Sequence, residues 1–225
     1  MIRFENVVKQ YGKYHALENI NLRIEAGEFV SIVGQSGAGK STLLKLIFAE
    51  EHVDGGKLLI DSINLRDLPQ SQIPYLRRRI GVVFQDMKLL PRRTTFENVA
   101  FAMEVAGYGR EKIEQDVPRI LSLVGIADKS ASFPEEMSGG EQQRVAIARA
   151  MAHKPILLLA DEPTGNLDEI NSAEILDLLH KINSLGTTVI LATHARDLVN
   201  KIKKRVITIE KGKIINDRQH GSYQL

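Results

Sequence analysis

A glycine-rich segment near the N-terminus carries the first residues that could do chemistry. It fits the pattern Gly-x-x-x-x-Gly-Lys-Ser/Thr and consists of Gly34, Gln35, Ser36, Gly37, Ala38, Gly39, Lys40, Ser41 and Thr42. Glycines let the backbone curl until successive N–H groups point at a phosphate chain, and a helix that begins there adds its positive dipole end. We therefore expect Lys40 to reach the β- and γ-phosphates of a nucleotide, and the Ser41 hydroxyl to bind Mg²⁺.

A pair of carboxylates follows an apolar run that reads as a buried strand. Residues 156–160 lead directly into Asp161 and Glu162. In an open parallel sheet, the carboxyl ends of the strands meet where ligands bind. Asp161 is then placed to support Mg²⁺, directly or through a water, and Glu162 to act as general base on an attacking water. The alternative is a pair that only caps a turn, and the phosphate loop in the same chain disfavours it.

A second candidate anion site begins a helix pattern in the middle of the chain. Ser138 is a suitable N-cap, and Glu141, three residues later, would complete a capping box. Gly139 and Gly140 between them weaken a helix by about 1 kcal/mol each, but they leave N–H groups open to an anion. Because the chain already has one phosphate loop, we expect this segment to contact the γ-phosphate of a nucleotide held by another copy.

The order of the predicted elements describes the scaffold that must position these residues. Residues 29–33 form a predicted strand that enters the glycine loop, and residues 43–48 a helix that leaves it. From residue 86 to 153 helical patterns replace strands, and Pro118 should start or kink the second of three helices, at residues 96–106, 111–124 and 141–152. Strands and helices then alternate, which indicates a parallel sheet, and the chain ends in a hairpin around Lys211 and Gly212.

These elements predict one α/β domain that spans residues 1–225. Residues 1–85 and 154–225 should form the α/β core together with a β-rich layer, and residues 86–153 an inserted helical subdomain. The 225 residues are 43% hydrophobic and 26% charged, which is enough chain for one sizeable core.

Composition excludes several classes of function. The net charge of +2 is too small to imply a polyanionic partner, and the lack of cysteine excludes disulfides, cysteine-ligated zinc and thiol catalysis. No apolar run approaches the ~20 residues needed to span a bilayer, and the N-terminus lacks the apolar core of a signal peptide. We therefore expect a soluble protein whose link to a membrane goes through a partner.

With these motifs in this order, nearly the whole chain resembles the ATP-binding subunits of ABC transporters. The family signature is Leu-Ser-Gly-Gly-Gln, from which Met137 and Glu141 depart while keeping an apolar side chain and a capping acceptor. The resemblance implies a P-loop NTPase fold, with a RecA-like ABC ATPase core, an antiparallel β subdomain and an inserted α-helical subdomain. It also implies an enzyme that hydrolyses ATP with Mg²⁺.

The resemblance implies roles for three more residues. Tyr11 stands where the family stacks an aromatic ring on adenine, although a tyrosine at a strand end can equally pack on the surface. Gln85 matches the glutamine that contacts Mg²⁺ and the attacking water and senses the membrane partner. His194 matches the histidine that contacts the γ-phosphate. We expect Glu162, His194 and Gln85 to be the catalytic residues, and Ser41, Gln85 and Asp161 to hold the metal.

The resemblance also implies a dimer. Two copies would enclose two ATP molecules head to tail, each between the phosphate loop of one subunit and Ser138, Gly139, Gly140 and Glu141 of the other. Asn166, Leu167 and Asp168 match the loop that crosses the dimer interface, although Asp168 can equally be only a helix cap. Gly165 and Asn166 depart from the Ser-Ala common in the family.

Finer similarity points to the cell-division branch of the family. It rests on the segments 84–101 and 158–168, with Asp86 and Arg93 as distinguishing residues. This branch implies a four-span membrane partner, a place on the cytoplasmic face of the inner membrane, and control of cell-wall hydrolases. Lipoprotein-release and macrolide-efflux ATPases are the near alternatives. A soluble ABC ATPase acting on DNA or ribosomes, or a P-loop kinase, would be a different class.

Overall fold

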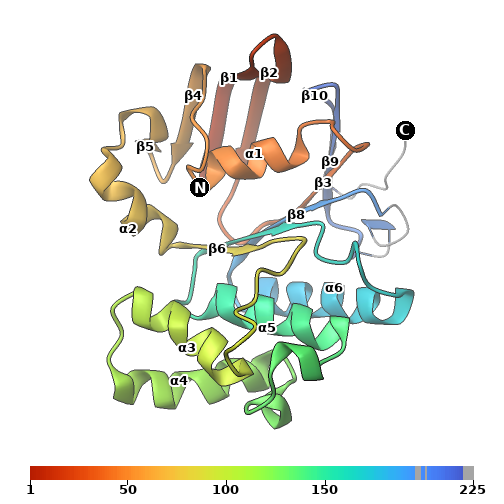
Figure 1. Ribbon diagram of the computed structural model, residues 1–225. Helices are drawn as coiled ribbons and strands as arrows, with labels where there is room; N and C mark the ends of the chain where they lie inside the picture. The colour runs from red at the N-terminus through yellow and green to blue at the C-terminus, as the bar shows by residue number, and fades with distance from the viewer. Residues whose placement is uncertain (196–198, 201, 220–225) are drawn as a thin grey trace.

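The computed structural model describes residues 1–195, 199–200 and 202–219. Its elements form two sheets with one helix between them and a layer of helices beyond the larger sheet (Figure 1). The smaller sheet is antiparallel, in the order β2-β1-β4-β5, and consists of β1 (Ile2–Tyr11), β2 (Tyr14–Ile24), β4 (Gly55–Ile60) and β5 (Ile63–Asn64). Its partly alternating burial is typical of strands with one face on a core.

The larger sheet carries the strands that lead into the candidate site. Its order is β10-β9-β3-β8-β7-β6, for β3 (Phe29–Val33), β6 (Ile80–Val83), β7 (Leu157–Asp161), β8 (Thr188–Thr193), β9 (Arg205–Glu210) and β10 (Lys213–Arg218). All neighbours pair in parallel except β9 and β10. Leu157 and Leu159 face one apolar core, while Leu158 and Ala160 face the other. Such two-sided burial explains why these strands read as continuous apolar runs.

Helices cover both faces of this sheet. Helix α1 (Lys40–Ile47) lies between the two sheets and contacts strands of both. The opposite face carries α3 (Thr95–Val105), α4 (Arg110–Leu123), α5 (Gly139–Met151) and α6 (Glu169–Ser184), which share one apolar core. A short helix, α2 (Ile73–Arg77), precedes β6. Within the described part of the chain, no helix combines the length and apolar character needed to cross a bilayer.

The elements confirm most of the sequence-based expectations and correct one of them. Helix α4 runs from Arg110 through Pro118 to Leu123, so the prediction that it could begin near Pro118 is wrong. Val117 and Leu121 are fully buried in the helical core. Their burial offsets the backbone hydrogen bond that proline cannot make, because tertiary packing supplies most of the stability of a helix in a protein. Helix α2 and β5 were missed, since five and two residues are too short to show a period.

Candidate functional site

Residues 34–39 of the phosphate loop lie between the end of β3 and the start of α1, and Lys40, Ser41 and Thr42 are the first residues of α1. Gly39 has a φ of 110°, and a Cβ there would lie 2.5 Å from the carbonyl oxygen of Ala16, so only glycine fits. The Lys40 side chain is buried and donates hydrogen bonds to the carbonyls of Gly34 (3.0 Å) and Gln35 (3.3 Å). The loop therefore folds back on its own lysine, and the ammonium group stays at the centre of the curl.

A cavity of about 620 Å³ lies beside this loop. Its lining consists of Tyr14, Ala16, Gln35, Ser36, Gly37, Gly39, Lys40, Ser41, Thr42, Gln85, Glu162 and His194. The cavity thus brings together residues from five separate stretches of the sequence, including the three expected catalytic residues. Its volume is in the range of small-molecule and cofactor sites.

Asp161 ends β7 beside the start of α1. The Ser41 hydroxyl donates a hydrogen bond to Asp161 Oδ1 at 3.0 Å. Burial raises the pKa of Asp161, and repulsion by Glu162 adds to this, while the Ser41 hydrogen bond opposes it. A cation would remove this penalty, and a hydroxyl, a carboxylate and the Gln85 amide supply the oxygen ligands that Mg²⁺ prefers. The residues therefore fit a magnesium ion.

Glu162 is held at the meeting point of two strand ends. Its N–H donates to the carbonyl of Ala192 at 2.8 Å, and its φ of 47° is uncommon for a residue other than glycine. Glu162 Oε1 lies 2.9 Å from His194 Nδ1 and 3.5 Å from Lys40 Nζ. Unusual backbone conformations that the surrounding structure enforces are concentrated at functional sites. The carboxylate is therefore fixed between an imidazole and an ammonium group.

The aromatic side chain at this cavity is not the one expected from the sequence. Tyr11 ends β1 with 42% of its surface exposed, and Lys9 Nζ lies 5.1 Å from its ring centroid. It does not line the cavity, whereas its cross-strand partner Tyr14 does. The Tyr14 hydroxyl donates to the carbonyl of Gly37 at 2.9 Å. The short Gly12-Lys13 turn between the two tyrosines was the signal in the sequence that could have drawn attention to Tyr14.

The second candidate anion site forms the start of α5, as expected. Ser138 is the N-cap and forms a capping box with Glu141: the Glu141 N–H donates to Ser138 Oγ at 3.3 Å, and the Ser138 N–H donates to Glu141 Oε2 at 2.8 Å. Gly139 and Gly140 are the first two residues of the helix. The residues that line the cavity of the phosphate loop include none of these four.

Between β7 and α6, the loop of Asn166, Leu167 and Asp168 passes close to this helix start. A Cβ at Gly139 would lie 3.3 Å from Leu167 Cδ2, which puts the two segments in direct contact. Asp168 is also the N-cap of α6 and accepts a hydrogen bond from the Asn171 N–H at 2.8 Å. Asp168 therefore does cap α6.

Comparison with known proteins agrees with this geometry. A family model described as "ABC transporter" matches residues 17–165. "Cell division ATP-binding protein FtsE" of Bacillus subtilis is 50% identical over 99% of this chain and 98% of its own length. The FtsE protein of Streptococcus pneumoniae is 49% identical, over 99% and 97%.

A solved structure shows the same fold. It is the dimeric post-hydrolysis state of the ATP-binding cassette MJ0796 bound to ADP and Pi, with a TM-score of 0.87 and 35% identity. The match covers 99% of this chain and all of the other. The family model, the identities and the shared fold agree with the phosphate loop and its paired carboxylates. The chain therefore belongs to the ABC transporter family, as an ATP-binding subunit that hydrolyses ATP.

Proposed function

We propose that this chain is the ATPase of a cell-division ABC complex that dimerises head to tail around two ATP molecules. In this complex it drives an integral membrane partner resembling FtsX and so regulates cell-wall hydrolysis from the cytoplasmic face of the inner membrane. The observation that best supports a dimer is that the expected ATP-contacting residues lie in two separate places on the chain. The phosphate loop and the carboxylates share one cavity, while Ser138 to Glu141 form a complete helix start outside it. A dimer gives that helix start an anion to bind.

The geometry supports a role for each group around the phosphate loop. Lys40, now bonded to two loop carbonyls, would exchange them for the β- and γ-phosphates. Ser41, Asp161 and Gln85 would hold Mg²⁺, which offsets the charge of the phosphate oxygens when bound. Glu162 would accept the proton of the attacking water. His194 lies against Glu162, so it can both orient the carboxylate and contact the γ-phosphate.

The adenine end and the dimer interface involve residues at the edge of this geometry. Tyr11 would stack on adenine after a change of side-chain position, with Tyr14 already at the cavity wall. Asn166, Leu167 and Asp168 would meet the partner subunit. They would do so next to the signature segment (Ser138 to Glu141) of the same chain, because Leu167 lies against Gly139. The relative MJ0796 cassette is a dimer bound to ADP and Pi, which supports this arrangement.

A groove near Gln85 supports a membrane partner. It has a volume of about 470 Å³, lies between α2, α3, α5 and β6, and is mainly apolar. Phe84, the neighbour of Gln85, lines it, together with the partly exposed Phe101 and Val105. A cytoplasmic segment of the partner that bound in this groove would contact Phe84, which is next to Gln85, the residue expected to contact the attacking water. The name of the FtsE relatives supports cell division as the setting.

The variant Glu162→Gln tests the dimer and the chemistry together. Removing the general base should lower the ATPase rate by about a hundredfold or more, while ATP binding is retained. The variant should therefore accumulate as an ATP-bound dimer, measured by size-exclusion chromatography with light scattering. Glu111→Gln, on the exposed first turn of α4, is the control and should keep the parent's rate. A variant that stays monomeric at saturating ATP and keeps its rate would show that the scheme is wrong.

The same variant tests the partner. It should sediment with membranes only when an integral partner resembling FtsX is co-expressed. Recovery instead with a lipoprotein-release or macrolide-efflux permease would assign the chain to that branch, and recovery with DNA or ribosomes would contradict a membrane complex.

A further inference from the structure

The signature segment of this chain carries a charge that its family pattern lacks. Glu141 stands where glutamine is common, and its Oε2 accepts hydrogen bonds from the Ser138 N–H (2.8 Å) and hydroxyl (2.9 Å). These hydrogen bonds, and a lesser contribution from Lys129, hold the pKa of Glu141 below its usual range. The carboxylate is therefore ionised at neutral pH, in the first turn of the helix that would receive a γ-phosphate.

A carboxylate at this position opposes an incoming phosphate in two ways. Like charges repel, and the repulsion is stronger at a partly buried site than in water. The carboxylate also accepts the hydrogen bond of the Ser138 hydroxyl, which is the donor that the phosphate would need. A glutamine would cap the helix equally well without the charge.

Lys129 is the cation that faces this carboxylate. It ends a 3-10 turn (Ala127–Lys129), and its Nζ lies 3.1 Å from Glu141 Oε1, on the oxygen that Ser138 does not use. The turn itself is closed by backbone hydrogen bonds, from Lys129 N to Ile126 O (3.1 Å) and from Ser132 N to Lys129 O (3.0 Å). The side chain of Lys129 is therefore not needed to form the turn.

We propose that Lys129 is a positioning residue that neutralises Glu141, and thereby sets how tightly the signature segment of one subunit binds the γ-phosphate of ATP held by the other. The proposal rests on the head-to-tail dimer of the proposed function. Without Lys129 the signature segment would present a net negative charge to the phosphate. With it, the pair is neutral, as glutamine would be.

Dimerisation of variants in a Glu162→Gln parent tests this role. We expect Lys129→Ala to raise the MgATP concentration for half-maximal dimerisation by about tenfold, which is the effect of about 1.4 kcal/mol. ATP binding by the monomer, measured with a fluorescent nucleotide, should not change, because Lys129 does not line the phosphate-loop cavity. Because salt screens charge repulsion, the defect should shrink between about 50 mM and about 500 mM NaCl.

Rescue separates charge neutralisation from a merely structural tether. Adding Glu141→Gln to Lys129→Ala should restore dimerisation to within about twofold of the parent, since no uncompensated charge remains, and Lys129→Arg should retain it. Arg110→Ala, which removes one positive charge from an exposed ion pair with Glu114 in the same subdomain, is the matched control. It should dimerise like the parent.

The contrary outcomes are distinct. If the parent dimerises and Lys129→Ala dimerises equally well, Lys129 has no such role. If the double variant stays as weak as Lys129→Ala, the lysine acts as a tether and the proposal is overturned. If the parent itself remains monomeric with MgATP, the dimer of the proposed function fails, and this proposal fails with it.

Discussion

Asp161 places the requirements of catalysis and of stability in opposition at a single residue. Its pKa is raised, mainly by burial, so the fold disfavours the ionised form that a cation site needs. The pKa of Asp161 in the folded state lies above its unfolded value of about 4. Below the unfolded value the carboxyl is protonated in both states, so it does not lower the stability of the fold. The penalty grows as the pH rises from the unfolded value through the folded-state pKa.

Asp161→Asn should therefore stabilise the nucleotide-free protein at pH 7.5 while it abolishes most of the activity. The amide oxygen can still accept the Ser41 hydrogen bond, but it cannot balance a cation, so we expect a fall in kcat of about a hundredfold or more. Thermal unfolding without nucleotide should show a higher Tm than the wild type, and the difference should shrink as the pH is lowered toward 4. Asp177→Asn, at an exposed position of α6, should leave Tm nearly unchanged. A lower Tm for Asp161→Asn at neutral pH would contradict the argument.

Among the elements, the hairpin of β9 and β10 supports the phosphate loop from outside the site. The N–H of Gly212 donates to the carbonyl of Ala38 in the loop at 3.0 Å, and its carbonyl accepts from the Glu18 N–H of β2 at 2.8 Å. The φ of Gly212 is 77°, and a Cβ there would lie 2.8 Å from the carbonyl oxygen of Ala16. The turn therefore joins the loop to the antiparallel sheet, and it has no room for a side chain.

Gly212→Ala should weaken ATP binding without removing any residue of the site. The strained φ costs about 1–2 kcal/mol, and relief of the close contact would move the turn away from Ala38. We expect ATP affinity to fall by about tenfold, with a smaller effect on kcat. Gly186→Ala provides the control, because Gly186 also has a positive φ, 102°, but has open space around it. Equal ATP affinities for the two variants would show that the turn does not support the loop.

The features of the fold and the site that could be predicted from the sequence are those that depend on neighbouring residues. Contacts between residues far apart in the chain could not be predicted. The predicted strand at residues 29–33 is confirmed to the residue, and the Ser138–Glu141 capping box is confirmed, because both follow from local patterns. The hairpin around Gly212 was predicted, but its bond to Ala38 was not, since that contact joins residues far apart in the chain. Tyr14 was missed for the same reason. Tyr11 and Tyr14 flank the same two-residue turn, and only the folded structure shows that Tyr14 is the one beside the phosphate loop.

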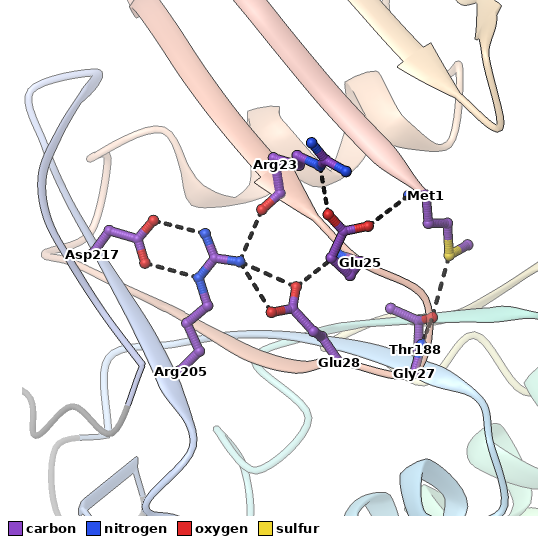
Figure 2. Close-up of polar contacts among 8 residues, drawn as sticks. All are labelled: Met1, Arg23, Glu25, Gly27, Glu28, Thr188, Arg205 and Asp217. Carbon is purple, nitrogen blue, oxygen red and sulfur yellow. Dashed lines mark hydrogen bonds and ion pairs between the residues drawn. The ribbon is translucent and has the colours of Figure 1, made fainter.

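Across the whole molecule, one arginine links the two sheets (Figure 2). Arg205 of β9 makes a two-fold ion pair with Asp217 of β10 and bonds to Glu28 at 3.1 Å and to the carbonyl of Arg23, at the end of β2. Its side chain is only 10% exposed, against 37% for Asp217. The guanidinium group therefore balances two carboxylates and ties the antiparallel sheet to the parallel one.

Arg205→Met should lower the free energy of unfolding by about 2 kcal/mol, less than for a fully buried pair because Asp217 is partly exposed. Urea unfolding measures the change. Arg23→Ala is the control, since it removes an exposed ion pair with Glu25 and should cost about 0.5 kcal/mol or less. Adding Glu28→Gln and Asp217→Asn to Arg205→Met should recover part of the loss, because no unpaired carboxylate then remains. If Arg205→Met unfolds like Arg23→Ala, the arginine contributes nothing measurable to the attachment of the two sheets.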